Sequence, residues 1–457
     1  MKAISKDLQR EQYIKMTETP VKKLVVTLAI PTTISMLITS IYNLADSYFV
    51  GQINTMASAA VGVVMGLMTI IQAFGFMLGH GAGSVVARML GQKKPEEATD
   101  YASVSFFTSI ILGVAIAVLG LKFNTSLMYG LGSSETVLPY SSVYSGYILL
   151  AAPFMTGGCV LNNILRYEGK AALAMVGLTL GGVLNIGLDA FTMMVLKMGV
   201  HGAGLSTAIS QVISFIVLLS VFLMGKTQSK LKLERFAKCL PLLCTVIVTG
   251  LPSLVRQGLG SFATIMLNNY AKDYGDAAIA AMSIVTRISM FIFCFGLGIG
   301  QGFQPVCAFN YGAGKYKRVR QSYYFTMVAA EFFLGSLALI GLVFSNDLIR
   351  IFRNDPKVIE IGTFALRFHL MALFFHPVIV CTNMLFQSIG KSVRATFVST
   401  LRSGLCFIPV IMVLRRCMGL TGIQISQPAA DAISFIIAAV FAVTYMRELP
   451  TKDSDGV

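Results

Sequence analysis

Apolar stretches of bilayer length follow one another along almost the whole 457-residue chain, with short polar segments between them. About 20 consecutive apolar residues are enough to cross the hydrocarbon core of a membrane as a helix. Charged residues make up only 12% of the sequence, which excludes an ordinary water-soluble globular protein. We therefore expect an all-α polytopic membrane protein with twelve transmembrane helices, at residues 24–50, 57–88, 98–121, 138–166, 170–196, 202–224, 240–270, 277–311, 321–345, 358–389, 393–414 and 421–446.

The basic residues predict how the chain is oriented in the membrane. They outnumber the acidic residues by 36 to 21, and most of them fall in the two tails and in the loops that follow even-numbered helices. Because loops rich in Lys and Arg stay on the inner side, both termini are expected in the cytoplasm, with the protein in the cell inner membrane. The net charge of +15 is then explained by contact with membrane lipid rather than with nucleic acid.

The sequence repeats itself at an offset of 221 residues. The aligned pairs include Pro31 and Pro252, Gly91 and Gly312, Gly169 and Gly390, and, after one deletion, Gly199 and Gly419. Because the offset contains six predicted spans, both halves cross the membrane in the same direction, which predicts two six-helix bundles related by a parallel internal repeat. A cavity between two such bundles is typical of a transporter. The predicted domains are an N-terminal tail at 1–23, an N-lobe at 24–224, a basic linker at 225–239, a C-lobe at 240–446 and a C-terminal tail at 447–457.

Ionisable side chains inside the predicted spans are the main candidates for function, because each costs about 2.5–3.5 kcal/mol to insert. In the first half these charges are expected to be acidic only, at Asp46 and Asp189. The second half carries two acids and four arginines, at Glu331, Asp431, Arg256, Arg287, Arg367 and Arg402. The two halves are therefore expected to differ in their chemistry.

Four polar residues of the first half are predicted to form one pocket. The expected orientation places Asp46, Asp189 and Thr207 at similar depths toward the outer side. Asn185 precedes Asp189 by one helical turn and shares its face. Two carboxylates in an apolar pocket repel each other and lose hydration, so such a pair can load a proton on one side and release it on the other. The alternatives are helix capping or an ion pair with a loop lysine for the acids, and ordinary interhelical hydrogen bonds for Asn185 and Thr207.

The remaining ionisable residues are open to two interpretations each. Glu331 is either a carboxylate used in coupling or substrate binding, or the partner of a membrane arginine. Asp431 follows Pro428 and is expected to cap the start of the last helix. His369 and His376 lie seven residues apart and form either a titrating relay or two histidines satisfied by their neighbours.

Several motifs resemble those of the multidrug and toxic compound extrusion (MATE) transporters. They are LADSYFVG in the first span, GAGSVVARMLGQKK after the second, NIGLDAF in the fifth and MGVHGAGLSTAIS before the sixth. The resemblance runs from about residue 22 to 447 and implies a two-lobed, twelve-helix antiporter that expels cationic drugs, driven by inward proton or sodium flow. It places the family's cation site on Asp46, Asn185, Asp189 and Thr207.

The chain departs from this family pattern in its second half. Family members with a coupling site in the C-lobe carry acids in helices seven and ten, where this chain offers Gln257, Asn268, His369 and His376. Ion coupling is therefore expected to depend on the N-lobe.

The expected function is a proton-coupled efflux antiporter for lipophilic cations, which works as a monomer and needs no cofactor. Sodium is the alternative coupling ion, bound by Asp46, Asn185 and Asp189, and no other metal site is expected. An enzyme, and hence any catalytic residue, is not expected because no HExxH pair, GxSxG turn or Cys-His arrangement occurs at a common depth.

The second half supplies the candidate substrate contacts. They are Glu331, Arg256, Gln257 and Asn268. A flippase for a lipid-linked sugar precursor is the alternative function, since a cationic cavity would suit its anionic substrate. That alternative requires Arg256, Arg287 and Arg402 to face the cavity.

Overall fold

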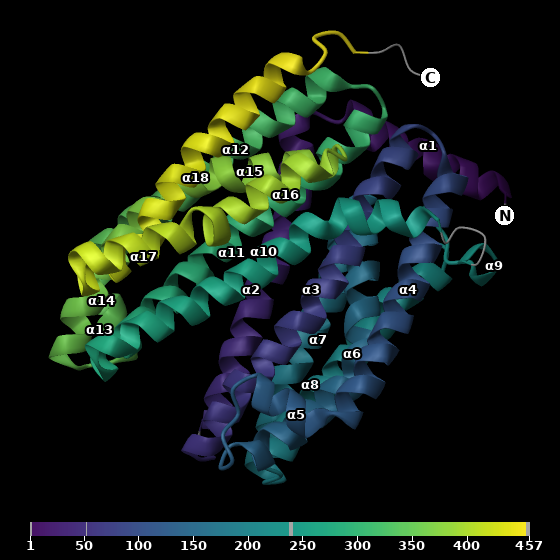
Figure 1. The fold of residues 1–457 in the computed structure, drawn as a ribbon. Coiled ribbons are helices and arrows are strands. Elements are labelled where there is room, and N and C mark those ends of the chain that lie inside the picture. The colour runs from purple at the N-terminus through teal and green to yellow at the C-terminus, as the bar shows by residue number, and fades with distance from the viewer. Residues whose placement is uncertain (1, 52, 237–240, 454–457) are drawn as a thin grey trace.

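The computed structural model describes residues 2–51, 53–236 and 241–453. Within these ranges the chain is helical and contains no strand (Figure 1). Twelve helical segments of the described chain are long and apolar enough to cross a membrane. Their ends differ from the predicted ones by five residues at most, so the twelve-helix fold class is confirmed.

The first half of the chain supplies six spanning segments. They are α2 (Val21–Gly51), α3 (Thr55–Gly91), α4 (Pro95–Lys122), α6 (Leu138–Tyr167), α7 (Ala171–Asp189), which continues as the π-helix η1 (Ala190–Val195), and α8 (Val200–Leu223). Three shorter helices accompany them, namely α1 (Lys2–Glu18), α5 (Asn124–Gly130) and α9 (Leu233–Phe236). Asn54 caps α3, because its side-chain oxygen accepts a hydrogen bond of 2.7 Å from the Ala57 amide.

The second half supplies the other six. They are α10 (Leu242–Ala271) with η2 (Lys272–Tyr274), α11 (Asp276–Gly312), α12 (Tyr316–Val343), α14 (Pro356–Ala372) with η3 (Leu373–Phe375) and α15 (His376–Ser388), α16 (Ser392–Thr400) with the π-helix η4 (Leu401–Leu405) and α17 (Phe407–Met418), and α18 (Leu420–Glu448). The short α13 (Ser345–Phe352) precedes α14. Both π-helical segments lie at a membrane charge: η1 follows Asp189 and η4 contains Arg402. Local π-geometry is frequent at functional positions.

Equivalent glycines of the two halves adopt the same unusual backbone conformation. The φ angle is 79° at Gly169 and 83° at Gly390, and it is 58° at Gly199 and 60° at Gly419. Positive φ favours glycine because a Cβ would clash with the backbone. The agreement at both pairs confirms the parallel repeat that the sequence predicts.

The two lobes meet at the end of the molecule that carries both termini, and they diverge toward the opposite end (Figure 1). We call the first the termini end. There, a Cβ on Gly91 would strike the carbonyl oxygen of Phe309, and one on Gly312 would strike that of Arg88. Each residue of one contact lies 221 positions from its counterpart in the other, so the contact is symmetric. Arg88 also donates a hydrogen bond of 2.9 Å to the Ser388 carbonyl across the lobes.

The linker between the lobes is anchored to the N-lobe by a buried carboxylate. Glu168, at the end of α6, accepts hydrogen bonds from the backbone amides of Gln228 at 2.9 Å and Ser229 at 2.8 Å. The Ser229 hydroxyl also donates to it. The described part of the linker is therefore held against the N-lobe. Residues 237–239 of the predicted linker lie outside the described residues, as do residue 1 and residues 454–457 of the predicted tails.

Asp431 is the centre of a buried charge cluster in the C-lobe, which corrects its assignment as a helix cap. It lies inside α18, which begins at Leu420, and only 1% of it is exposed. Its carboxylate accepts from Arg402 Nε at 3.0 Å, from His376 Nε2 at 3.0 Å and from Gln427 Nε2 at 2.9 Å. Pairing of this kind offsets the desolvation of the three charged or polar partners.

Asp431→Asn is expected to lower the free energy of unfolding by about 3–5 kcal/mol, because it leaves the Arg402 guanidinium without its counter-charge. Thermal melting in detergent micelles measures the effect. Asp347→Asn, at an exposed position of α13, is the control and should melt like the wild type. Equal melting of the two variants would show that the cluster does not stabilise the C-lobe.

Gly91→Leu is expected to destabilise the protein by about 1–3 kcal/mol, because the added side chain must displace the backbone of α11 at Phe309. Gly66→Leu is the matched control in the same helix, since no atom lies within 4 Å of a Cβ placed there. Thermal melting curves of the two variants measure this difference in stability. A Gly91→Leu protein that melts at the wild-type temperature would contradict the close contact between the lobes.

Candidate functional site

Asp46 and Asp189 come together in the N-lobe, as the sequence predicts. Asp46 lies near the end of α2 that points away from the termini end, and Asp189 is the last residue of α7. Asp46 is 6% exposed and Asp189 is fully buried. The helices that carry them, α2 and α7, pack against each other, so two charged carboxylates here would repel each other. Two buried acids in this arrangement favour a shared proton or a bound cation over two free charges.

Tyr144 of α6 joins this pair, and the sequence analysis missed it. Its buried hydroxyl donates a hydrogen bond of 2.9 Å to Asp46 Oδ2 and lies 3.5 Å from Thr207 Oγ1. Thr207 in turn accepts a hydrogen bond of 3.2 Å from Asn185 Nδ2. A chain of hydrogen bonds therefore runs from Asp46 through Tyr144 to Thr207 and Asn185. The last two are the polar residues that were predicted to share its pocket.

Asp189 is held less completely than Asp46. Its carboxylate lies beside the Ser206 hydroxyl, but neither oxygen has a partner in normal hydrogen-bonding geometry among the described residues. Ser206 is instead paired with Thr192 of η1 at 2.9 Å. The Asp46 Oδ1 and Asn185 Oδ1 atoms are also buried without a hydrogen-bond partner there. Unsatisfied oxygens on both acids and on the amide can receive a proton or ligate a small cation.

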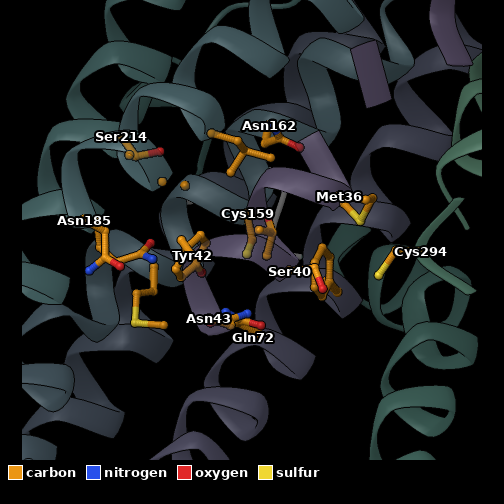
Figure 2. A pocket seen from close by; sticks show the side chains of 18 of the residues that line it. Met36, Ser40, Tyr42, Asn43, Gln72, Cys159, Asn162, Asn185, Ser214 and Cys294 are labelled. Atoms are coloured by element: carbon orange, nitrogen blue, oxygen red, sulfur yellow. The ribbon is translucent and has the colours of Figure 1, made fainter. Parts of the chain in front are cut away.

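A cavity of about 400 Å³ adjoins this cluster and is lined by both lobes. Figure 2 shows Tyr42, Asn185 and Ser214 of the N-lobe around it, with Cys294 of α11 on the opposing lobe. Asn185 and Thr207 line the cavity, whereas Asp46 and Asp189 do not belong to its lining. The acids therefore lie behind an amide and a hydroxyl that contact both the cavity and the carboxylate cluster.

The predicted second-half residues divide into two groups. Arg256 and Gln257 line the cavity, and so does the exposed Arg287 of α11. Asn268 and Glu331 are not among the lining residues. Glu331 is half-buried on α12, one turn before the buried Leu334. Neither Asn268 nor Glu331 therefore contacts this cavity in the described conformation.

Arg402 is also absent from the cavity lining, because it pairs with Asp431. His376 belongs to the same cluster, while His369 Nδ1 lies 3.0 Å from the Ala365 carbonyl oxygen. The two histidines thus have separate partners, as expected of histidines satisfied by their neighbours.

Arg166 corrects the expectation that membrane charges of the first half are acidic only. It is the penultimate residue of α6 and is 3% exposed. The predicted span 138–166 ends on Arg166, so the sequence already indicated an arginine at the end of this membrane helix. The sequence also contained an indication for Tyr144. Its spacing from Ser141 and Ser145 is helical, and the three residues form a buried polar face of α6.

The comparison with protein families gives two matches within this chain. The model of the MatE family matches residues 31–191 and 252–413. The two matches begin 221 positions apart, which is the offset of the sequence repeat.

Curated relatives match over nearly their whole length. The multidrug export protein MepA of Staphylococcus haemolyticus is 26% identical, with 98% of each chain covered. MepA of Staphylococcus aureus is 25% identical, with 98% of this chain and 99% of that protein covered.

Solved structures also match over nearly the whole chain. One is an outward-facing conformation of a multidrug resistance MATE family transporter of the MOP superfamily, with a TM-score of 0.90, 26% identity and coverage of 95% of this chain and 98% of that one. Another is a MOP superfamily transporter from Pyrococcus furiosus, with a TM-score of 0.91, 26% identity and coverage of 96% and 99%. It is described as having a binding pocket of reverse polarity that suggests a different function. Together with the paired family matches, these likenesses establish that the chain belongs to the MatE family of multidrug efflux transporters.

Proposed function

We propose that this protein is a proton-coupled antiporter that exports lipophilic compounds, with Asp46 and Asp189 as the groups that carry the coupling proton. The observation that carries the proposal is the pair of buried carboxylates on the packed helices α2 and α7, directly behind the cavity lining. Repulsion and desolvation both disfavour the doubly charged pair, so the pair readily accepts a proton.

The hydrogen-bonded chain supports a route from protonation to the cavity. A proton on Asp46 changes the bond that this carboxylate accepts from Tyr144. Tyr144 contacts Thr207, and Thr207 accepts from Asn185, so a change at Asp46 reaches two residues that line the cavity. Antiport requires that substrate and proton favour different conformations of the lobes. In this mechanism, proton loading shifts the N-lobe helices and lowers the affinity of the cavity for substrate.

The proposed orientation places both termini in the cytoplasm of a cell whose inner membrane holds the protein. The lobes meet at the termini end and diverge at the other, so in this orientation the structure is closed toward the cytoplasm (Figure 1). Its likeness to an outward-facing MATE transporter agrees with that orientation. Substrate is taken up from the cytoplasm or inner leaflet in the opposite conformation.

Lipophilic cations remain the substrate class predicted from the family resemblance. Their apolar parts would pack on aromatic and methionine side chains of the cavity, such as Met36, Phe76, Phe154 and Phe291. The name of the curated relatives, multidrug export protein, supports a broad substrate range.

Asp46→Asn and Asp189→Asn are expected to abolish uptake of a fluorescent cation into inverted vesicles driven by a pH gradient, because neither amide can carry a proton. Initial uptake rates at matched expression are the measurement. Asp347→Asn removes an exposed carboxylate elsewhere and should transport like the wild type. Wild-type rates in both site variants would refute the proposed coupling site.

Sodium coupling is separated from proton coupling by the driving gradient. The unsatisfied oxygens of Asp46, Asn185 and Asp189 are also suitable ligands for sodium. In proteoliposomes, a pH gradient without sodium should drive transport, and a sodium gradient at fixed pH should not. The reverse result would replace the proton with sodium at the same residues.

Tyr144→Phe is expected to move the pH midpoint of transport upward by about one to two units. The lost hydrogen bond to a charged acceptor is worth about 1.5–3 kcal/mol and stabilises only the ionised carboxylate, so proton release then needs a higher pH. Transport rates across a pH series give the midpoint. Tyr147→Phe, in the same helix but with its hydroxyl beside His201, should leave the midpoint unchanged. Identical profiles for the two variants would contradict a role for Tyr144.

A flippase for a lipid-linked sugar precursor is the second candidate function. Arg256 and Arg287 line the cavity and favour it, while Arg402 does not line it. A flippase would not protect a pump-deficient host from toxic dyes, whereas the proposed antiporter should.

A further inference from the structure

Two arginines without a counter-charge, Arg166 and Arg256, lie with His80 at the end of the cavity nearest the termini end. His80 and Arg256 line the main cavity. Arg166 lines a small recess that shares Gln301 and three other residues with that cavity. We call His80, Arg166, Arg256 and Gln301 the cavity floor. Its residues come from α3 and α6 of one lobe and from α10 and α11 of the other.

The arginines of the cavity floor have only neutral hydrogen-bond partners. Arg166 donates to Asn163 Oδ1 at 2.6 Å and to the side-chain oxygen of Gln301. Arg256 donates to Asn383 Oδ1 at 3.3 Å. Neither arginine belongs to an ion pair among the described residues, and none of the described residues that line the cavity is Asp or Glu. This contrasts with Arg402, which has the carboxylate of Asp431 as its partner.

Two buried side-chain nitrogen atoms of the cavity floor also lack a hydrogen-bond partner among the described residues. Arg166 Nε and His80 Nε2 have no hydrogen-bond partner among the described residues, although Arg166 is 3% and His80 1% exposed. Two arginines that have only neutral partners, one of them with a free buried donor, are poorly compensated, and a bound anion would supply the missing charge.

We propose that the cavity floor is a binding subsite for the anionic group of an amphipathic substrate, a carboxylate or a sulfonate. The anion would lie between Arg166 and Arg256, and the apolar part of the molecule would extend along Met36, Phe76 and Phe154. Planar guanidinium groups suit such oxyanions. The volume of about 400 Å³ accommodates a small aromatic body. The inference rests on the proposed transport function and adds organic anions and zwitterions to its substrates.

The position of the two arginines also links the subsite to the transport cycle. Arg166 belongs to the N-lobe and Arg256 to the C-lobe, so a movement of one lobe against the other changes the distance between their guanidinium groups. An anion held by both would then bind the two conformations with different affinity. Alternating access requires such a difference.

Equilibrium dialysis of the purified protein in detergent tests the subsite without any ion gradient. The probes are radiolabelled 2-naphthoate, its neutral analogue 2-naphthamide, its cationic analogue 2-naphthyltrimethylammonium, and inorganic sulfate as a competitor. The wild type should bind 2-naphthoate about 10- to 100-fold more tightly than 2-naphthamide, as charge-assisted hydrogen bonds would give. Arg166→Gln and Arg256→Gln should each remove most of that difference and leave binding of the cation undiminished.

Arg367→Gln is the matched control, because Arg367 of α14 lies outside the cavity and donates to Ser345. It should bind 2-naphthoate like the wild type. If Arg166→Gln does not yield a monodisperse protein, Arg256→Gln decides, since that side chain is only half-buried. Equal affinity for naphthoate and naphthamide, or unchanged naphthoate binding in Arg256→Gln, would overturn the proposal. Sulfate that displaces naphthoate at naphthoate's own concentration would also overturn it, because a free inorganic ion would then explain the site.

The outcome is independent of the coupling mechanism. Asp46→Asn should lose gradient-driven transport and still prefer naphthoate over naphthamide, whatever its overall affinity, because Asp46 lies outside the cavity lining. Loss of that preference in Asp46→Asn, with the arginine variants unaffected, would place the anion elsewhere and overturn the assignment. Normal dialysis results with no transport in any condition would refute the proposed function alone.

Discussion

The cost of removing charge from water is the constraint on which this molecule depends, because several of its charged groups lie inside apolar spans. The structure offsets that cost to different degrees. Asp431 has an arginine, a histidine and an amide donor, Asp46 has the single hydroxyl of Tyr144, and Asp189 has no partner in normal geometry. A carboxylate with strong partners stays charged, whereas a carboxylate with weak ones can change its protonation state at small cost. Compensation, rather than depth in the membrane, therefore distinguishes a stabilising charge from one suited to ion coupling.

The sequence was sufficient to predict the features that depend on order along the chain. Bilayer-length apolar stretches locate each span, since a helix of fixed rise must cross a slab of fixed thickness. The repeat at 221 residues was readable because equivalent turns need glycine at the same place, as Gly169 and Gly390 show. Asp46, Asp189 and Thr207 could be placed near one another because alternating span directions fix the depth of each residue. Neighbours at one helical turn, such as Asn185 and Asp189, needed no structure at all.

Features that depend on how each helix is rotated about its axis were not predictable. Helices that are apolar on all sides carry no strong pattern that says which face meets a neighbour. For that reason Glu331 could be expected in the cavity although it is not among the lining residues. Tyr144 could not be assigned to Asp46, 98 positions away in the chain. Asp431 was misplaced for a different reason: Pro428 suggested a helix start, but α18 contains this proline and continues through it.

The geometry also limits how proton and substrate can influence each other. A cation and a proton that competed for one carboxylate would need that carboxylate in the cavity lining, yet both acids lie behind Asn185 and Thr207. In the proposed mechanism, the influence of protonation on the cavity is therefore conformational, passed on through those two side chains and the helices that carry them. At the opposite end, the cavity floor spans the junction of the lobes, so a ligand there responds to lobe movement directly. In the proposed mechanism, coupling depends on helix positions and does not require the substrate to be positively charged, so the proposed proton-binding cluster would drive the export of substrates of either charge.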